Sequence, residues 1–318
     1  MRARLSHAPW LAALVLVPVL ALLFVFLGAG FDFGYVIPRR LARLAAIVIG
    51  GVCVAWSSIV FQTITGNRIL TPAVMGYEAV YLLLQATLIL AAGAHSLVLL
   101  GSGGNLALSV ALMLGYSWAL HRWLFRDGRN AVDGLLLGLV LTMVIATFTQ
   151  FVQLWTSPGE FSLLLGFGQA SFDRARPAQL LVAGVLVAAL CLASRASLPA
   201  LDVLALGRDQ AISLGVDARR LVRRQFALVA ALVALSTSLL GPTAFMGIFV
   251  ANAAYAVAGS MRHRHTLAAG CLIAVAMFLL AQLAVEHLFN YRTTVGILVN
   301  LACGAWFLAL MLRKRAHA

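Results

Sequence analysis

The chain has 318 residues, of which 63% are hydrophobic and 10% are charged, and its mean hydropathy is +0.99. A water-soluble protein carries about 25% charged residues because its surface faces water, so this composition excludes a soluble globular protein. The formal net charge is +13. The basic residues fall in short clusters between apolar stretches, as in loops that flank membrane helices, and this argues against a nucleic-acid partner. We therefore predict an all-α protein, a polytopic transmembrane helical bundle that lies in the lipid bilayer.

The apolar stretches, taken in chain order, predict about ten membrane spans, since a helix needs about 20 apolar residues to cross the bilayer core. The first stretch follows Arg2 and Arg4 but exceeds the roughly 7–15 apolar residues of a signal peptide, so we expect a retained helix. The eighth is short and follows Gly241-Pro242. Half-length helices are tolerated at membrane depth only where protein or a cavity surrounds them. The predicted spans are 9–30, 41–61, 73–92, 97–120, 132–155, 177–193, 225–240, 245–258, 266–289 and 295–312.

The distribution of arginine predicts the orientation of these spans, because cytoplasmic loops carry an excess of basic residues. With the N-terminus in the cytoplasm and ten alternating spans, most of the 23 basic residues lie on the cytoplasmic side. Both termini are then cytoplasmic, and residues 1–318 form a single domain that crosses the bacterial plasma membrane many times. The basic residues left outside are Arg39, Arg40, Arg43, Arg174, Arg176 and Arg292.

The longest hydrophilic stretch, residues 194–224, is predicted to be a cytoplasmic insert of two short helices. Asp202 and Asp209 can each cap a helix that Gly207 or Gly215 ends, and Asp217 can cap the span that follows. Apolar side chains of the insert have no bilayer to enter, so we expect them to face a protein partner. The alternative is an ordinary loop whose arginines only set the topology. These side chains are Leu204, Leu206, Ala211, Ile212 and Leu214.

At this insert the sequence resembles a known family, the iron-siderophore and cobalamin permeases of ABC importers. That family carries a leucine-rich stretch, then LG, an acidic residue, an alanine and LG again. In the family this segment lies in a cleft of the ATPase subunit and transmits its closure, so the resemblance implies ATPase coupling for the matching residues. They are Leu206, Gly207, Asp209 (one place later than usual, after Arg208), Ala211, Leu214 and Gly215.

Three further stretches carry the resemblance along the rest of the chain. FQTITGNRILTPAVMG matches a family motif through Gln62, Asn67, Pro72 and Gly76. GPTAFMGIF, which begins at Gly241, matches the glycine-proline, phenylalanine and glycine pattern. TVGILVNLACGAWFLALML resembles the motif of the last helix, through Val295, Gly296, Gly304 and Phe307.

Two departures from the family pattern indicate a subgroup. Ala251-Asn252 stands where most members have proline-histidine, and the next arginine is Arg262. NRILTP replaces the more common NPLADP. Both variants resemble permeases for ferric catecholate or mixed-ligand siderophores, in which two different permeases pair.

The resemblance implies a permease subunit that imports a ferric siderophore, without cofactor or metal site of its own. The chain has no P-loop, since its single lysine is Lys314 in the tail, so we expect a separate ATPase rather than an enzyme. The implied partners are ATPase subunits, a second permease (a paralogue or a second copy) and an extracytoplasmic substrate-binding protein. Outer arginines would dock that binding protein, with lipid-headgroup anchoring as the alternative. The candidates are Arg39, Arg40, Arg43 and Arg292, of which Arg40 and Arg292 are favoured.

Polar residues inside the spans are candidates for lining the transport pathway, and hydrogen bonds between helices are the alternative explanation. We expect the carboxylates of Glu78 and Asp133 near the cytoplasmic interface. Glu286 and His287 are expected to be solvated near the outer end of the ninth span, with a gate as the alternative. A secondary transporter would need a carboxylate embedded in the membrane, and the sequence places none clearly at the centre of a span. A cobalamin or haem permease of the same family stays open. The pathway candidates are Gln62, Asn67, Asn252 and Asn300, with Thr65 and Gln282 beside them.

Overall fold

The computed structural model describes residues 8–28, 30, 32–93, 95–124, 131–243 and 245–315, and every regular element in these ranges is a helix. The all-α prediction is confirmed for this part of the chain. Arg2, Arg4, Arg126 and Arg129, which belong to the predicted cytoplasmic segments, lie outside it, and so does the side chain of Asp133. The elements are α1 (Ala8–Phe26), α2 (Val36–Thr65), the 3₁₀ helix η1 (Pro72–Met75), α3 (Tyr77–Ala92), α4 (His95–Leu124), α5 (Ala131–Gln153), α6 (Pro158–Phe167), α7 (Pro177–Arg195), α8 (Leu198–Leu204), α9 (Arg208–Ser213), α10 (Ala218–Leu240), α11 (Met246–Ala258), α12 (His263–Leu283), the π-helical turn η2 (Ala284–Leu288) and α13 (Val295–Arg315).

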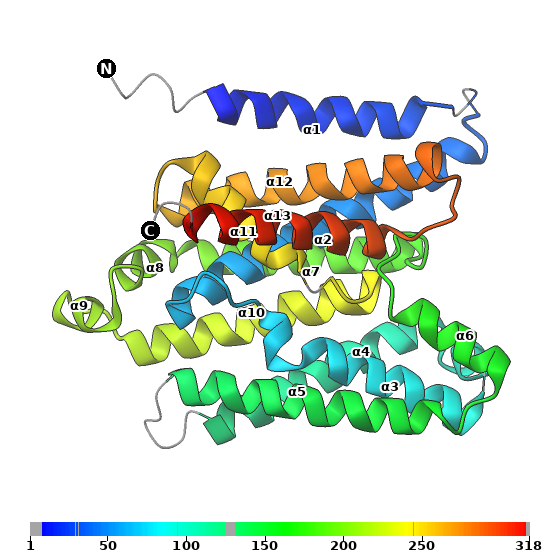
Figure 1. The fold of residues 1–318 in the computed structure, drawn as a ribbon, viewed down its shortest axis with the longest axis horizontal. Helices are drawn as coiled ribbons and strands as arrows, with labels where there is room; N and C mark the ends of the chain where they lie inside the picture. Colours follow the sequence, from blue (N-terminus) through cyan, green and yellow to red (C-terminus); the bar gives the residue numbers. More distant parts are fainter. Residues whose placement is uncertain are drawn as a thin grey trace.

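The long helices lie roughly along the longest axis of the molecule (Figure 1). α8 and α9 lie at one end, which we call the insert end, together with the start of α1 and the end of α13. α6 and the connection between α12 and α13 lie at the opposite end, which we call the far end. Within the described ranges, six helices are long and apolar enough to cross a membrane, and shorter apolar helices cover 13–26, 77–92, 246–258 and 295–309. These segments overlap the ten predicted ranges, and the count of ten spans stays a prediction.

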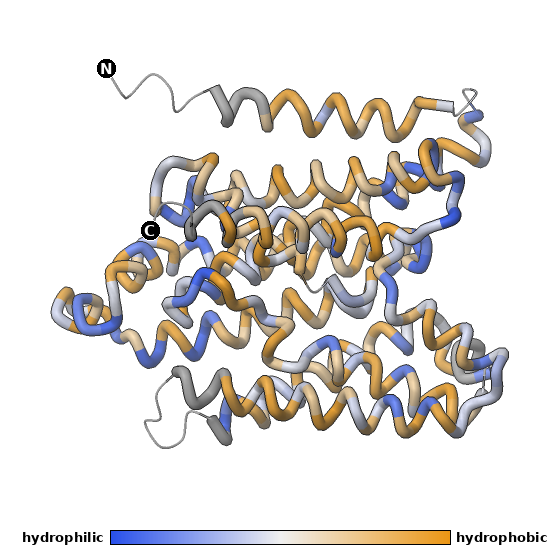
Figure 2. Tube along the Cα trace, in the orientation of Figure 1, coloured by the Kyte–Doolittle hydropathy of each residue, from blue (hydrophilic) through white to orange (hydrophobic). Residues whose placement is uncertain are grey.

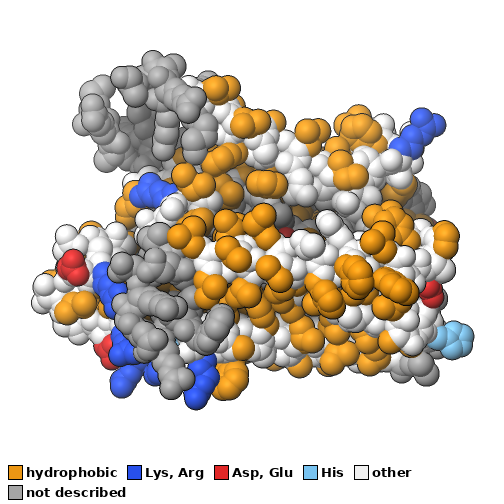
Figure 3. Space-filling model, turned by 60° about the horizontal axis from the view of Figure 1, so that its bottom comes forward, with side chains coloured by type: hydrophobic (Ala, Val, Ile, Leu, Met, Phe, Trp, Pro, Cys, Tyr) orange, Lys and Arg blue, Asp and Glu red, His pale blue; other side chains and the backbone are white. Residues whose placement is uncertain are grey.

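Apolar side chains cover the middle of the bundle, and charged side chains collect toward its ends. Figure 3 shows this distribution on one face, and Figure 2 shows the same change of hydropathy along the chain trace. On α7, for example, Leu181 is 73% exposed and Val185 is 68% exposed. A continuous apolar surface of this extent is not found on soluble monomers. The surface is therefore suited to contact with lipid and with other membrane proteins.

Two of the shorter helices begin inside the bundle rather than at one of its ends. α3 follows Gly76 and α11 follows the break at Gly241-Pro242, and both begin near the middle of the long axis (Figure 1). The φ angles of Gly76 and Gly241 are 85° and 94°, a conformation that glycine adopts without steric cost. The predicted interruption at Gly241-Pro242 is confirmed. The continuous span predicted over 73–92 is wrong, because η1 and the turn at Gly76 precede α3.

The interruptions also change where two predicted features lie. Glu78 is in the first turn of α3, so it lies near the middle of the bundle, and its predicted place at the cytoplasmic interface is wrong. The predicted span 97–120 is broken near its start, because Gly101 in α4 has a φ of 61°.

α2 is the centre of the packing and contacts α10, α11 and α12. Two adjacent glycines of α2 make these contacts close, as small residues commonly do between membrane helices. A Cβ atom added at Gly50 would meet the side chain of Leu240 in α10. One added at Gly51 would lie 2.8 Å from Val275 Cγ2 and 3.1 Å from the Val275 backbone nitrogen in α12. α10 and α12 are therefore as close to α2 as these glycines permit. A larger residue at either position would push the helices apart.

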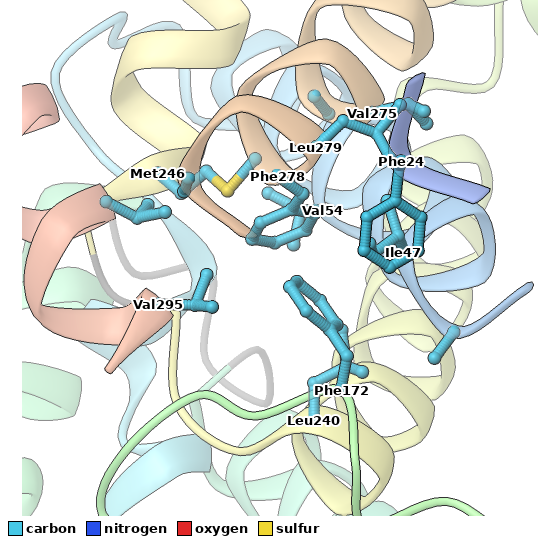
Figure 4. Packing of buried hydrophobic residues seen from close by; sticks show 14 of the residues in the cluster. Phe24, Ile47, Val54, Phe172, Leu240, Met246, Val275, Phe278, Leu279 and Val295 are labelled. Carbon is cyan, nitrogen blue, oxygen red and sulfur yellow. The ribbon is translucent and has the colours of Figure 1, made fainter. Parts of the chain in front are cut away.

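Buried apolar side chains fill the space where α1, α2, α10 and α12 meet. Figure 4 shows Phe24, Ile47 and Val54 pointing toward side chains of α12. Phe172, from the connection between α6 and α7, places its ring against that of Phe278 in α12, with centroids 5.1 Å apart and planes at 76°. Edge-to-face pairs of this kind add about 0.5–1.5 kcal/mol beyond the buried area.

Replacing Gly51 with alanine is expected to destabilise the protein, because the new Cβ meets the backbone of α12 and not only a flexible side chain. Overpacking of this kind typically costs about 1–3 kcal/mol. The midpoint of thermal unfolding of the purified chain in detergent measures the effect. Gly115→Ala in α4 is the matched control, since an added Cβ there has no neighbour within 4 Å. A Gly51→Ala protein that unfolds at the wild-type temperature would contradict the packing described.

Candidate functional site

The insert folds as two short helices at the insert end. Its buried side consists of Leu201 and Leu204 of α8 and Ala211 of α9, which pack in one cluster with side chains of α2, α10 and α12. Gly207 separates the two helices with a φ of 123°, and Gly215 follows α9 with a φ of 81°. Both glycines thus end helices as predicted. The insert is a packed unit rather than an ordinary loop.

The predicted caps of the insert are partly wrong. Asp217 caps α10 as expected, since its Oδ1 accepts a hydrogen bond of 3.0 Å from the backbone N–H of Arg220. Asp202 lies inside α8 and Asp209 lies in the first turn of α9, so neither is a cap. Asp209 still favours the start of α9, because a carboxylate near a helix N-terminus is stabilised by the helix dipole. Asp202 has a different role.

Asp202 joins the insert to two long helices. Its Oδ1 accepts a hydrogen bond of 2.7 Å from the backbone N–H of His263, and it lies 2.6 Å from Nδ1 of the same residue. The other ring nitrogen, Nε2, lies 2.8 Å from Thr63 Oγ1. Thr63 belongs to α2 and His263 begins α12, where it is 2% exposed. We call this chain of contacts the Asp202–His263–Thr63 link. It holds α8 against the ends of α2 and α12.

A second polar contact fixes the start of the insert. Gln225, buried in α10, donates a hydrogen bond of 2.6 Å from Nε2 to Ser197 Oγ, and Ser197 Oγ donates to Ser194 O at 2.7 Å. α8 therefore cannot shift without disturbing α2, α10 and α12 together.

The outward side of the insert exposes three large apolar side chains to water. Leu206 is 65% exposed, Ile212 is 55% exposed and Leu214 is 64% exposed. We call them the insert patch. Arg208, Asp209 and the other polar side chains of α9 beside the patch are exposed as well. An apolar patch with a charged surround is typical of a protein-binding surface. Of the predicted coupling residues, Ala211 is buried and anchors the insert and Gly207 is half-buried, while Leu206, Arg208, Asp209, Leu214 and Gly215 are exposed.

Two of the predicted docking arginines form contacts within the chain at the far end. The Arg40 guanidinium donates hydrogen bonds to the carbonyls of Phe24 (2.9 Å), Val25 (3.3 Å) and Leu27 (2.6 Å), where α1 ends. It also lies 3.6 Å from a carboxylate oxygen of Glu286. Arg43 contacts the same carboxylate at 3.1 Å and also pairs with Asp173.

Glu286 is the centre of this network. It is 8% exposed and accepts a further hydrogen bond of 2.7 Å from Gln282 Nε2. The prediction that interfacial water solvates Glu286 is therefore wrong, although His287 beside it is exposed. The π-helical turn η2 carries Glu286.

The other two predicted docking arginines are exposed. Arg39 lies beside Tyr35, with a hydrogen bond of 2.6 Å from Nη1 to the Tyr35 hydroxyl, and Arg292 lies in the connection before α13. Arg174 is different: it donates to the carbonyls of Gly166 and Gln169, and burial lowers the pKa of its guanidinium. Arg39 and Arg292 are therefore the members of the predicted set whose geometry suits an external partner.

Two of the predicted pathway amides bind backbone. Gln62 Nε2 and Asn252 Nδ2 both donate to the carbonyl of Arg68, at 2.8 and 3.0 Å, in the segment that returns from α2 to η1. Asn67 accepts a hydrogen bond of 2.9 Å from the N–H of Ile69 in the same segment. Asn300 is partly buried in α13, and within the described residues its Oδ1 has no hydrogen-bond partner. The first three amides shape the re-entrant turn, and a role in lining the pathway stays a prediction.

The structure adds residues that the sequence analysis did not select for function. They are His263 and Thr63. One sequence feature could have indicated their contact. A threonine in the last turn of α2 and a histidine at the start of α12 both lie at the predicted cytoplasmic boundary. His263 contacts both partners directly, although Asp202 is 61 positions and Thr63 is 200 positions away in the sequence.

Comparison with known proteins is consistent with this arrangement. Residues 11–313 match the model of the FecCD transport family. The chain is 33% identical over 293 residues to the petrobactin import system permease protein YclO of Bacillus subtilis, covering 92% of this chain and 93% of that one. It is 31% identical over 283 residues to the petrobactin import system permease protein FatC of Bacillus anthracis, covering 88% and 80%.

A solved structure shares the fold. A metal-chelate type ABC transporter in an inward-facing conformation superposes with a TM-score of 0.84, covering 96% of this chain and 99% of that chain. The two sequences are 18% identical, so the likeness concerns the fold alone.

Arg40→Ala is expected to lower the midpoint of thermal unfolding of the purified chain. The change removes three hydrogen bonds to α1 and one of two cations beside the buried Glu286. Loss of charged hydrogen bonds at a partly buried site typically costs about 1–3 kcal/mol. Arg39→Ala removes an exposed arginine one position away and is expected to leave the midpoint unchanged. Equal midpoints for the two variants would argue against a structural role for Arg40.

Proposed function

The chain belongs to the FecCD transport family, and on this premise we propose that it is the permease subunit of an ATP-driven importer that carries a ferric siderophore across the bacterial plasma membrane. The observation that carries the proposal is the insert patch, which lies in the segment that matches the family's coupling sequence. A patch of leucine and isoleucine in water requires a partner. A separate ATPase subunit supplies both the partner and the energy for transport.

The arrangement of the helices supports the proposed topology. Ten spans place both termini and the insert at the cytoplasmic end, and the start of α1, the end of α13 and α8–α9 do lie together at the insert end (Figure 1). α3 and α11 each count as one span of half length, since each begins near the middle of the bundle and reaches one end. The far end then faces outward, toward the binding protein.

The Asp202–His263–Thr63 link supports a route by which movement of the ATPase is transmitted to the long helices. When the ATPase subunits close, they push on the insert patch. The buried contacts of α8 transmit the displacement to the start of α12 and the end of α2. α2 is in turn packed against α10 at Gly50, so the displacement reaches the interrupted helices at the centre.

The cargo and the remaining partners are proposed from the relatives and the far end. Two relatives, each matched over most of its own length, are named as petrobactin import permeases. We therefore propose a ferric siderophore of the catecholate or mixed-ligand class as cargo, and a paralogous permease as the second membrane subunit. Arg39 and Arg292 are the residues proposed to dock the binding protein, because Arg40 and Arg43 are engaged inside the chain.

The first test is Leu214→Asp, which places a charge in the insert patch. The substituted side chain is exposed, so the chain is expected to fold, while the cost of burying an unpaired carboxylate against a partner weakens association at least tenfold. The wild-type tagged chain is purified in mild detergent from its native membrane, and the copurifying proteins are identified by mass spectrometry. An ATPase and a second permease are expected with wild type, and the ATPase is expected to be lost from Leu214→Asp.

Phe33→Asp is the matched control, since Phe33 is a large apolar residue that is 67% exposed at the far end. It should retain the ATPase. The intact complex, reconstituted in liposomes with its binding protein, is then expected to take up ferric petrobactin when ATP is present on the insert side. Uptake by the chain without an ATPase would support a secondary transporter instead. Uptake of haem or cobalamin in place of the siderophore would reassign the cargo.

His263→Ala tests the proposed route of transmission. The variant is expected to retain the ATPase, because the insert patch is unchanged, but to transport at least tenfold more slowly per ATP hydrolysed. The ratio of siderophore transported to ATP hydrolysed measures this, and a purely structural defect would not selectively lower it. His265→Ala changes an exposed histidine two positions away and should keep the wild-type ratio. An unaltered ratio in His263→Ala would remove the link from the mechanism.

A further inference from the structure

A small polar cavity lies inside the bundle, where the interrupted helices meet. Its volume is about 30 Å³, which is enough for about two water-sized particles. One carboxylate and several hydroxyl groups line it, together with a few small apolar side chains. The polar lining residues are Ser57, Ser58, Thr71, Glu78, Ser236, Thr237 and Thr243.

Glu78 is the acid of this cavity, and among the described residues it has no ion pair with a cationic side chain. The acids with such a partner are Asp173, Asp217 and Glu286. Within the described part of the chain one hydrogen bond reaches the Glu78 carboxylate, from the backbone N–H of Thr243 to Oε1 at 2.9 Å. The Glu78 side chain is half-buried, and an ionised carboxylate that has lost part of its hydration is stabilised by a nearby positive charge.

Two backbone features stabilise a negative charge on Glu78 and oppose the cost of burying it, namely the N–H of Thr243 and the start of α3. The carboxylate is in the first turn of α3, where the helix dipole stabilises a negative charge. On the other side, Ser236 and Thr237 belong to the last turn of α10, which ends at Gly241 and carries the negative end of its dipole. A carboxylate, hydroxyl groups and the carboxyl end of an interrupted helix together form a region of negative potential.

The hydroxyl of Ser236 is a second and independent indication of a ligand. Ser236 is 4% exposed, and among the described residues its Oγ has no hydrogen-bond partner. Buried polar atoms are almost always paired, so an unpaired hydroxyl that lines a cavity indicates that something else occupies the space. Water alone would satisfy the hydroxyl but would leave the charge of Glu78 uncompensated.

We propose that this cavity binds one monovalent cation, Na⁺, between the carboxylate of Glu78 and the hydroxyl groups of Ser236 and its neighbours. All its polar side-chain atoms are oxygens, which suits hard cations rather than transition metals. A single carboxylate balances one positive charge, whereas Ca²⁺ is usually held by several carboxylates among six to eight oxygens. Membrane transporters coordinate Na⁺ at interrupted helices in the same chemical manner. The cation would hold α3, α10 and the turn before α11 together.

The test uses the purified full-length chain in detergent, at constant ionic strength and pH, with choline replaced stepwise by Na⁺. The midpoint of thermal unfolding of the wild type is expected to rise with Na⁺ and to saturate, because a ligand that binds only the folded state stabilises it. Binding of radioactive sodium should reach about one ion per chain. Glu78→Gln, which keeps the shape of the side chain and removes its charge, should abolish both responses.

Ser236→Ala keeps the test decisive if Glu78→Gln does not fold. Loss of one neutral oxygen ligand should raise the Na⁺ concentration for half saturation about fivefold. Ser238→Ala is the matched control, because Ser238 also has a buried hydroxyl with no partner in the described part of the chain but does not line the cavity. Equal midpoints of the wild type in choline and in Na⁺ would overturn the proposal, as would equal sodium responses of Ser236→Ala and Ser238→Ala. A midpoint that depends on pH and not on Na⁺ would replace the cation with a proton on Glu78.

Discussion

The rest of the structure depends on the close packing of α2 against α10 and α12. Gly50 and Gly51 bring the three helix backbones together, and no larger residue fits at either position without displacing Leu240 or the backbone of Val275. This contact gives the chain a dense centre in a solvent where the hydrophobic effect does not drive helices together. The start of α3, the end of α10 and the start of α11 lie inside this packed bundle, so the unpaired backbone groups there do not face lipid.

Several polar side chains of the bundle lie where a helix ends or is interrupted. Gln62 and Asn252 hold the returning segment after α2 by one carbonyl, that of Arg68, while Thr243 donates its N–H to Glu78 beside the break after α10. At the far end, Arg40 supplies the hydrogen bonds that the last carbonyls of α1 lack. These side chains therefore supply hydrogen-bond partners to backbone groups where helices end or are interrupted.

Local signals in the sequence predicted much of the fold. Runs of apolar residues marked the helices, Gly241-Pro242 marked the interruption, and Gly207 and Gly215 marked the ends of the insert helices. Their positions follow from conformational preferences of single residues, which do not depend on distant partners. The family motif in the insert also lies on the exposed patch that suits a partner.

The contacts that define the candidate sites could not be predicted in this way. Asp202 has the residue type and spacing of a helix cap, yet it binds His263, 61 positions away. Arg40 has the position of a docking arginine and instead binds α1 and Glu286. Each outcome depends on which helices become neighbours, and the apolar pattern of a membrane span does not state which of its faces meets which helix.

The insert patch has a consequence for how such a protein can be produced. Three large apolar side chains stand in water whenever the subunit is alone, and exposed surfaces of this kind promote self-association. A permease made in excess over its ATPase would be a target for aggregation and for the proteases that remove unassembled subunits. Under the proposed function, balanced synthesis of the two subunits is therefore a requirement of this surface, and exposure of the patch marks a subunit whose assembly is incomplete.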